Sequence, residues 1–83
     1  MPAYPRVAKI QGWEGVTVLR LEVLEDGAVG KVELVQSSGH SVLDEAAIRA
    51  VQRWRFEPAR RGNSAVTCSI EVPIRFKLGD AGA

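Results

Sequence analysis

Residues 66–78 have the sequence VTCSIEVPIRFKL, in which apolar and polar side chains alternate without a break. Apolar residues take every even position from Val66 to Leu78, and polar residues or proline take the odd ones. A period of two over this length predicts a long β-strand with one buried and one solvated face. Because Pro73 has no N–H to donate to a ladder, we expect this strand to lie at the edge of a sheet.

A second alternation begins at Gly15, about fifty residues earlier. One face of this predicted strand holds Thr17, Leu19, Leu21 and Val23, and the other holds Val16, Val18, Arg20, Glu22 and Leu24. Asp26-Gly27 follows directly, and this dipeptide favours the positive backbone angles of tight hairpin turns.

The return strand of this hairpin is predicted over residues 29–36. We expect Val32 and Leu34 to face inward, since they share one side of the strand. Gly30 indicates a bulge or a longer turn at the start of the strand.

A helix is predicted from Ser41, with Pro58 as the residue that stops it. Its apolar stripe steps by four, four and three residues through Leu43, Ala47, Val51 and Trp54. Ala46 and Ala50 widen this stripe, and Ser41 with Asp44 resembles a capping box. We expect Trp54 to close the stripe, Phe56 to fix the segment that leaves the helix, and Pro58 to turn the chain toward the last strand.

A short helix is expected near the N-terminus, because Tyr4-Pro5 suits a helix entrance. Residues 5–11 would form two turns with Val7 and Ile10 facing inward at a spacing of three. Gly12 and Gly15 would then end this helix.

The element order is therefore helix, strand, strand, helix, strand, with residues 60–64 (RRGNS) as a loop. This order predicts an α+β split βαβ fold with a three-stranded antiparallel sheet and both helices on one face. The first strand would be central, and the last would be a long edge strand. We expect one domain over residues 4–78, with flexible ends at 1–3 and 79–83.

The composition is that of an ordinary globular domain, with 46% apolar and 25% charged residues and a formal net charge of +1. Cys68 is the only cysteine, which excludes an internal disulfide and a cysteine-based zinc site. The chain has no run of 18 apolar residues and no signal-peptide character. We therefore expect any export or anchoring segment to lie outside this chain.

Residues 37–41 (SSGHS) and Asp44 contain the residue types of a serine triad. A triad needs an imidazole that one group orients and another contacts, normally from distant segments. Here the candidates crowd one loop and helix start, where such residues are good turn formers. We expect no catalytic, metal-binding or cofactor-binding residues and no enzymatic activity.

The only dense basic cluster lies around AVQRWRFEPARR, residues 50–61. It comprises Arg49, Arg53, Arg55, Arg60 and Arg61, interleaved with Trp54 and Phe56. Such interleaving is typical of a single-strand nucleic-acid platform, and split βαβ modules bind RNA. The sheet strands, however, lack the aromatic motif of an RNA-recognition domain, and the chain is nearly neutral. We keep an RNA-binding module as the alternative and expect no nucleic-acid partner.

The last strand has two interpretations. A long edge with unpaired backbone groups is normally covered or charged, and Pro73, Arg75 and Lys77 could serve as such protection. Alternatively, the small side chains of Thr67 and Ser69 let another backbone approach, so that a peptide adds as a strand. An unprotected edge also favours weak self-pairing, either as a homodimer or by strand exchange.

Several stretches together resemble the C-terminal domain of the TonB family over residues 4–78. They are Tyr4-Pro5, the hairpin positions Gly15 and Asp26-Gly27, SSGHSVLDEA followed by AIRAVQRWRFEPA, and the closing VPIRFKL. TolA has a related fold and is a second alternative, but the WRFEPA stretch favours TonB. Thr17 departs from the family, which commonly has an aliphatic residue there.

The resemblance implies a periplasmic domain of a longer protein with an inner-membrane helix that joins the proton-driven ExbB–ExbD complex. Such a domain binds the TonB box of an outer-membrane transporter and supports import of iron chelates, vitamin B12 or similar cargo. The box adds beside the last strand, which here maps to Val66, Thr67, Cys68, Ser69, Ile70, Glu71 and Val72. Tyr4 and Arg6 would be secondary transporter contacts.

Overall fold

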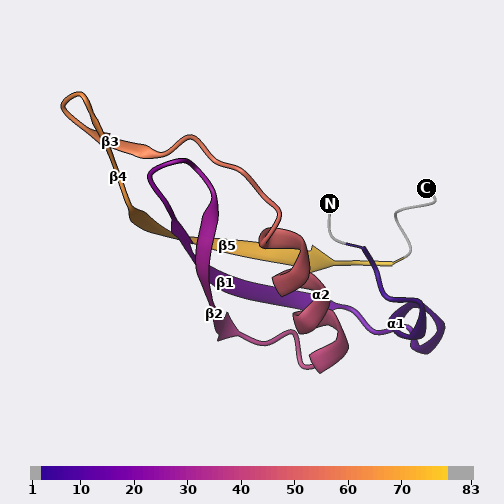
Figure 1. Cartoon of the computed structure of the whole chain (residues 1–83). Coiled ribbons are helices and arrows are strands. Elements are labelled where there is room, and N and C mark those ends of the chain that lie inside the picture. Colours follow the sequence, from indigo (N-terminus) through magenta and orange to yellow (C-terminus); the bar gives the residue numbers. More distant parts are fainter. Residues whose placement is uncertain (1–2, 79–83) are drawn as a thin grey trace.

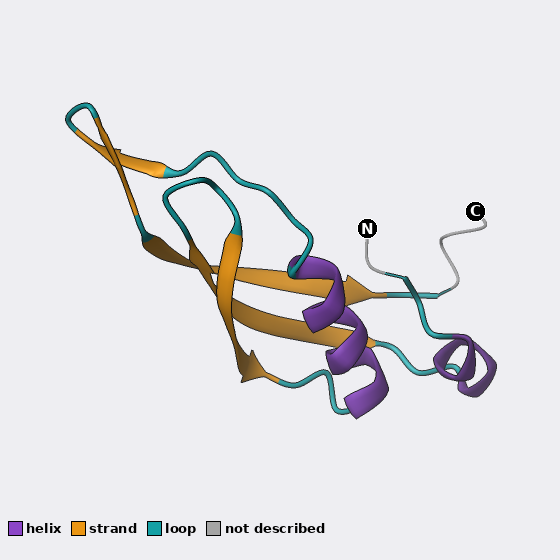
Figure 2. Ribbon diagram, in the orientation of Figure 1, coloured by secondary structure: helices purple, strands orange, loops and turns teal. Residues whose placement is uncertain are grey.

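A computed structural model describes residues 3–78, so that of the flexible ends expected at 1–3 and 79–83 only residue 3 lies within the described residues. The elements are α1 (Arg6–Gln11), β1 (Gly15–Val23), β2 (Val29–Gln36), α2 (Ser41–Val51), β3 (Ala59–Arg61), β4 (Ser64–Val66) and β5 (Cys68–Phe76). The main sheet is antiparallel with strand order β2-β1-β5, and α2 crosses one of its faces (Figures 1 and 2). The α+β class and the central first strand are confirmed.

The core lies between β1 and α2. Thr17, Leu19, Leu21 and Val23 are all buried on one face of β1, as their alternation predicts. The inward face of α2 supplies a fully buried stripe of Leu43, Ala47 and Val51. Burying each leucine or valine contributes about 1.5–3 kcal/mol, so this contact fixes α2 on the sheet.

Strand β2 contains two irregularities in its pairing with β1. Between Val29 and Val32 it has one residue more than β1, which confirms a bulge at Gly30. Leu34 lies opposite Leu19 but is 44% exposed, so its predicted burial is wrong. Because β2 is an edge strand, this side chain has no neighbouring strand on its outer side to cover it.

Helix α1 presents a different face from the predicted one. Ala8 is fully buried, whereas Val7 is 46% and Ile10 is 73% exposed, so the expected inward pair is wrong. Tyr4 holds this segment instead, since its hydroxyl donates to the Trp13 carbonyl and its ring packs edge-on against Phe76 at 5.4 Å. These contacts set the rotation of a six-residue helix whose own apolar surface is small.

Helix α2 ends at Val51, seven residues before the proline expected to stop it. The next residues form a turn, in which the Trp54 N–H donates to the Val51 carbonyl at 3.0 Å. The chain then becomes extended, and the Phe56 N–H donates to the Gly27 carbonyl at 2.8 Å. Pairing with the β1–β2 turn thus replaces continued helix.

The loop predicted at residues 60–64 is instead part of a hairpin. Ala59 pairs with Val66 and Arg61 with Ser64, which makes β3 and β4 a separate two-stranded sheet. Gly62, at a φ of 63°, provides the left-handed turn residue. The hairpin projects from one end of the molecule (Figure 1). The predicted strand over 66–78 is therefore divided at Thr67, and its main part is β5.

Candidate functional site

Strand β5 forms one edge of the main sheet. It pairs with β1 from Cys68 to Phe76, and within residues 3–78 no strand lies on its other side. The burial of alternate residues is as predicted, since Ile74 and Phe76 are buried while Ser69, Glu71, Pro73 and Arg75 are exposed. The outer edge of β5 is thus an open row of backbone groups along a strand of nine residues.

The position of Pro73 indicates which backbone groups point outward. Pro73 is paired with Val18 inside the ladder, and a proline is tolerated there when its nitrogen faces away from the partner strand. In an antiparallel pair these directions alternate along the strand. The backbone groups of Ser69, Glu71 and Arg75 therefore also point to the open edge.

One arginine on the uncovered face of the sheet forms ion pairs with side chains of both neighbouring strands. Arg20 contacts Glu71 at 2.8 Å and Glu33 at 3.1 Å, so it links all three strands. The hydrogen bond to Glu71, followed by the one to Glu33, raises the pKa of Arg20. Exposed ion pairs of this kind contribute at most about 1 kcal/mol each to stability, so their main effect is to fix the position of the Glu71 side chain on the sheet.

The structure divides the segment that the sequence singled out, residues 66–72. Val66 belongs to β4 and pairs with Ala59, and Thr67 is the exposed junction between β4 and β5. Residues 68–72 lie on the open edge of the main sheet. The open edge then continues beyond this segment to Phe76.

Tyr4 and Arg6 differ in their availability to a partner. The Tyr4 side chain is partly buried, and its hydroxyl is already bonded to Trp13. Burial and then the nearby charge of Glu14 raise the Tyr4 pKa. Arg6 is exposed at the start of α1. Arg6 is therefore the freer of the two predicted contacts.

Trp54, Phe56 and Pro58 lie half-buried on the segment between α2 and the β3–β4 hairpin. The rings of Trp54 and Phe56 are 6.1 Å apart, and both pack against the core. The neighbouring Arg53 and Arg55 are exposed, which explains the basic and aromatic interleaving without a stacking platform.

A buried polar cluster was missed by sequence analysis. Asp44 does not cap α2 with Ser41, because the helix has no side-chain cap bond and the carboxylate turns toward the sheet. It accepts hydrogen bonds from the Thr17 and Ser38 hydroxyls at 2.8 Å, from the Ser38 N–H at 2.9 Å and from Ser37. Thr17, at a position where the family commonly has an aliphatic residue, was the feature of the sequence that could have indicated this cluster.

The same cluster separates the residues of the triad-like stretch. Asp44 bonds to serine and threonine groups, while the His40 ring stacks on Trp13 at a centroid distance of 4.7 Å. The carboxylate therefore does not orient the imidazole. Among residues 3–78 there is also no group of three or more metal-ligating side chains.

No helix in the described part of the chain is long and apolar enough to cross a membrane.

Comparison with protein families gives one matching model, described as the Gram-negative bacterial TonB protein C-terminal, over residues 1–78. The chain is 47% identical over 77 residues to protein tonB2 of Pseudomonas aeruginosa and 38% identical over 77 residues to protein TonB of Vibrio cholerae. Each match covers 93% of this chain but only 28% and 32% of those relatives. The chain thus spans about a third or less of their length.

Solved structures show the same fold. The solution NMR structure of the Pseudomonas aeruginosa TonB C-terminal domain superposes with a TM-score of 0.80 at 28% identity, covering 94% of this chain and 79% of that one. A Helicobacter pylori TonB C-terminal domain has a TM-score of 0.72 at 24% identity, covering 94% and 70%. The second likeness concerns the fold alone.

Proposed function

Because this chain belongs to the family of Gram-negative bacterial TonB protein C-terminal domains, we propose that it is the partner-binding domain of a TonB-like energy transducer. It binds the TonB box of an outer-membrane transporter by adding the box as a strand to β5. The observation that carries this proposal is the open edge of β5 beside β1. The domain acts by binding and transmitting force, without an enzymatic reaction.

The geometry of the edge suits a load-bearing contact. Each main-chain hydrogen bond contributes only about 1 kcal/mol net to binding. A pull along the strand loads several aligned bonds together, so modest resting affinity is compatible with high mechanical resistance. Main-chain pairing also accepts boxes of different sequence, which suits a protein that serves more than one transporter.

The outward backbone groups define the centre of the contact. Ser69 and Glu71 each offer an N–H and a carbonyl, whereas Pro73 offers only a carbonyl. Within the mapped residues 66–72, we therefore place the strongest pairing at Ser69 and Glu71. The family resemblance implies a contact over residues 66–72, but Val66 is already paired with Ala59 and therefore contributes less.

The full-length protein, in this proposal, is anchored in the inner membrane and places this domain in the periplasm. It couples to ExbB and ExbD through segments that precede this chain. Proton-motive force is then transmitted to the transporter, which admits iron chelates, vitamin B12 or similar cargo.

An NMR titration with a peptide from the N-terminal tail of a TonB-dependent transporter tests strand addition. We expect saturable shifts of the amides of Ser69 and Glu71 and weaker ones at Val66. Glu71→Pro removes one outward N–H and should weaken binding about five- to tenfold, the equivalent of about 1–1.4 kcal/mol.

Glu71→Ala is the matched control, since both substitutions remove the ion pair with Arg20 but only proline removes the N–H. We expect its affinity to stay within about twofold of the parent chain. Equal affinities of the proline and alanine variants, or unchanged β5 amides with a cognate peptide, would exclude this site.

A further inference from the structure

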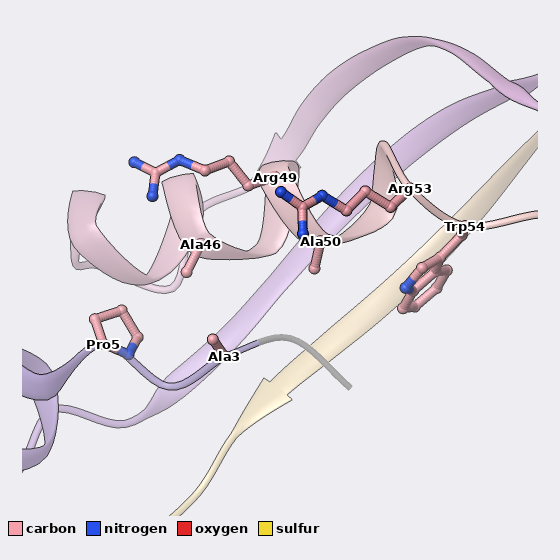
Figure 3. A pocket seen from close by; sticks show the side chains of 7 residues that line it. All are labelled: Ala3, Pro5, Ala46, Arg49, Ala50, Arg53 and Trp54. Carbon is pink, nitrogen blue, oxygen red and sulfur yellow. The ribbon is translucent and has the colours of Figure 1, made fainter.

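A groove of about 470 Å³ lies between α2 and the N-terminal segment (Figure 3). Ala3 and Pro5 form one wall, Ala46 and Ala50 form the other, and Trp54 lies at one end. The volume falls in the range of small ligand sites, which matches a short stretch of extended peptide. The groove flanks the fully buried stripe of α2, since Ala46 and Ala50 lie beside that stripe and Ala46 packs against the core, and it takes no part in the strand pairing described above.

Helical spacing explains how this groove arises. Ala46, Arg49, Ala50 and Arg53 are separated by three, one and three residues, so they line one side of α2 and its final turn. The two alanines are too short to fill the space beside Pro5. The same side thus combines an apolar floor, formed by Ala46 and Ala50, with a cationic rim, formed by Arg49 and Arg53. Figure 3 shows the Arg53 side chain extending back toward Ala50.

The charge of this rim is only partly compensated within the described part of the chain. Arg49 has one distant contact, 3.6 Å from Glu45, and both side chains are largely exposed. Arg53 has no ion pair with any residue between 3 and 78. Carboxylates are the natural complement of such guanidinium groups, because the hydrogen bonds formed are charge-assisted.

We propose that this groove is a second recognition site, which takes an extended segment of a partner protein carrying acidic side chains next to small apolar ones. The small apolar side chains enter over Ala46 and Ala50, and the carboxylates meet Arg49 and Arg53. Trp54 supplies a flat apolar surface at the end of the segment. The site is separate from β5 and does not depend on strand addition there.

The test uses the 83-residue chain and two capped hexapeptides, one alternating Glu with Ala and Val, the other with Lys in place of every Glu. Binding is followed by NMR at the Trp54 indole N–H and the methyl groups of Ala46 and Ala50. We expect saturable shifts with the acidic peptide and none with the lysine peptide.

Charge reversal and steric filling then locate the contact. The double variant R49E/R53E should weaken binding at least tenfold, whereas R60E/R61E, an equal charge change on the β3–β4 hairpin, should change it less than twofold. Ala50→Leu fills the groove without changing charge and should weaken binding at least fivefold. A folded spectrum with native β5 shifts confirms that each variant is intact.

Three results would overturn the proposal. One is equal weakening by the two charge reversals, which would indicate unspecific attraction. Another is undiminished binding by the Ala50→Leu variant. The third is a response confined to the amides of Ser69 and Glu71, which would support strand addition and exclude the groove.

Discussion

Asp44 is a buried carboxylate at the first turn of α2, and it joins three segments of the chain. Its hydrogen bonds come from Thr17 on β1 and from Ser37 and Ser38 in the loop before the helix. An unpaired buried carboxylate would be costly, but here the donors replace the lost water. Asp44 therefore fixes how α2 begins relative to the sheet.

The pKa of Asp44 reflects two opposed effects. Burial raises it, but the hydrogen bonds from Ser37, Ser38 and Thr17 together lower it below the ordinary value of 3.8. A carboxyl with a lowered pKa in the folded state stabilises the fold fully above its unfolded pKa. This contribution is lost as the pH falls below 3.8 and through the folded pKa.

Asp44→Asn should lower the free energy of unfolding by about 1–3 kcal/mol at pH 7, because the amide cannot accept all of these bonds. The difference from the parent chain should shrink as the pH falls below the ordinary value of 3.8 and through the lower pKa of folded Asp44, where this carboxylate becomes protonated. Urea unfolding at pH 7 and at a series of pH values below 3.8 measures both effects. A difference that stays constant with pH would contradict this role.

Ser41→Ala is the matched control on the same helix turn. A capping serine would cost about 1 kcal/mol on substitution. Because α2 has no side-chain cap bond, we expect a change below about 0.5 kcal/mol.

At the scale of elements, the β1–β2 turn holds the segment that leaves α2. Gly27 is buried with a φ of 86°, and its carbonyl accepts the Phe56 N–H at 2.8 Å. A Cβ at this position would lie 2.1 Å from the Phe56 carbonyl oxygen. The turn and the segment at Phe56 therefore fit only with glycine at this position.

Gly27→Ala should lower the free energy of unfolding by more than about 2 kcal/mol, since backbone strain adds to the clash with Phe56. Gly12→Ala provides the comparison, because its φ is 72° but no atom lies within 4 Å of the added Cβ. That change should cost about 1–2 kcal/mol, from the left-handed backbone alone. Thermal or urea unfolding of both variants would show the ordering, and equal losses would contradict the clash.

At the scale of the whole molecule, the domain is long and flat, with principal extents of 48 × 25 × 15 Å. The β5 edge runs along this length, and the β3–β4 hairpin extends one end (Figure 1). An open edge of this kind is a template for pairing with a second copy. The shape thus favours association through β5.

We expect concentration-dependent dimerisation of the isolated domain, which sedimentation velocity or light scattering would detect. Glu71→Pro should shift the equilibrium toward monomer, and Glu71→Ala should not, because only proline removes the outward N–H. A single monomer mass for the parent chain at millimolar concentration would contradict this expectation.

The alternation of residues 15–24 and 66–78 by itself determined β1, the main part of β5 and the residues that share each face. Asp26-Gly27 determined the hairpin between β1 and β2. These features follow from sequence because side-chain period and turn chemistry are local properties of the backbone. Pro73 likewise indicated that β5 lies at an edge.

Only the tertiary structure decided which faces and ends the neighbouring elements cover. Leu34 is half-exposed because β2 lies at an edge, and Ile10 is exposed because contacts from Tyr4 orient α1. Helix α2 ends early because the chain at Phe56 pairs with Gly27. The periodic pattern of the sequence indicates which side chains share a face of a strand or helix. Their burial, the ends of the helices and the arginine-rimmed groove depend instead on contacts with segments that are distant in sequence.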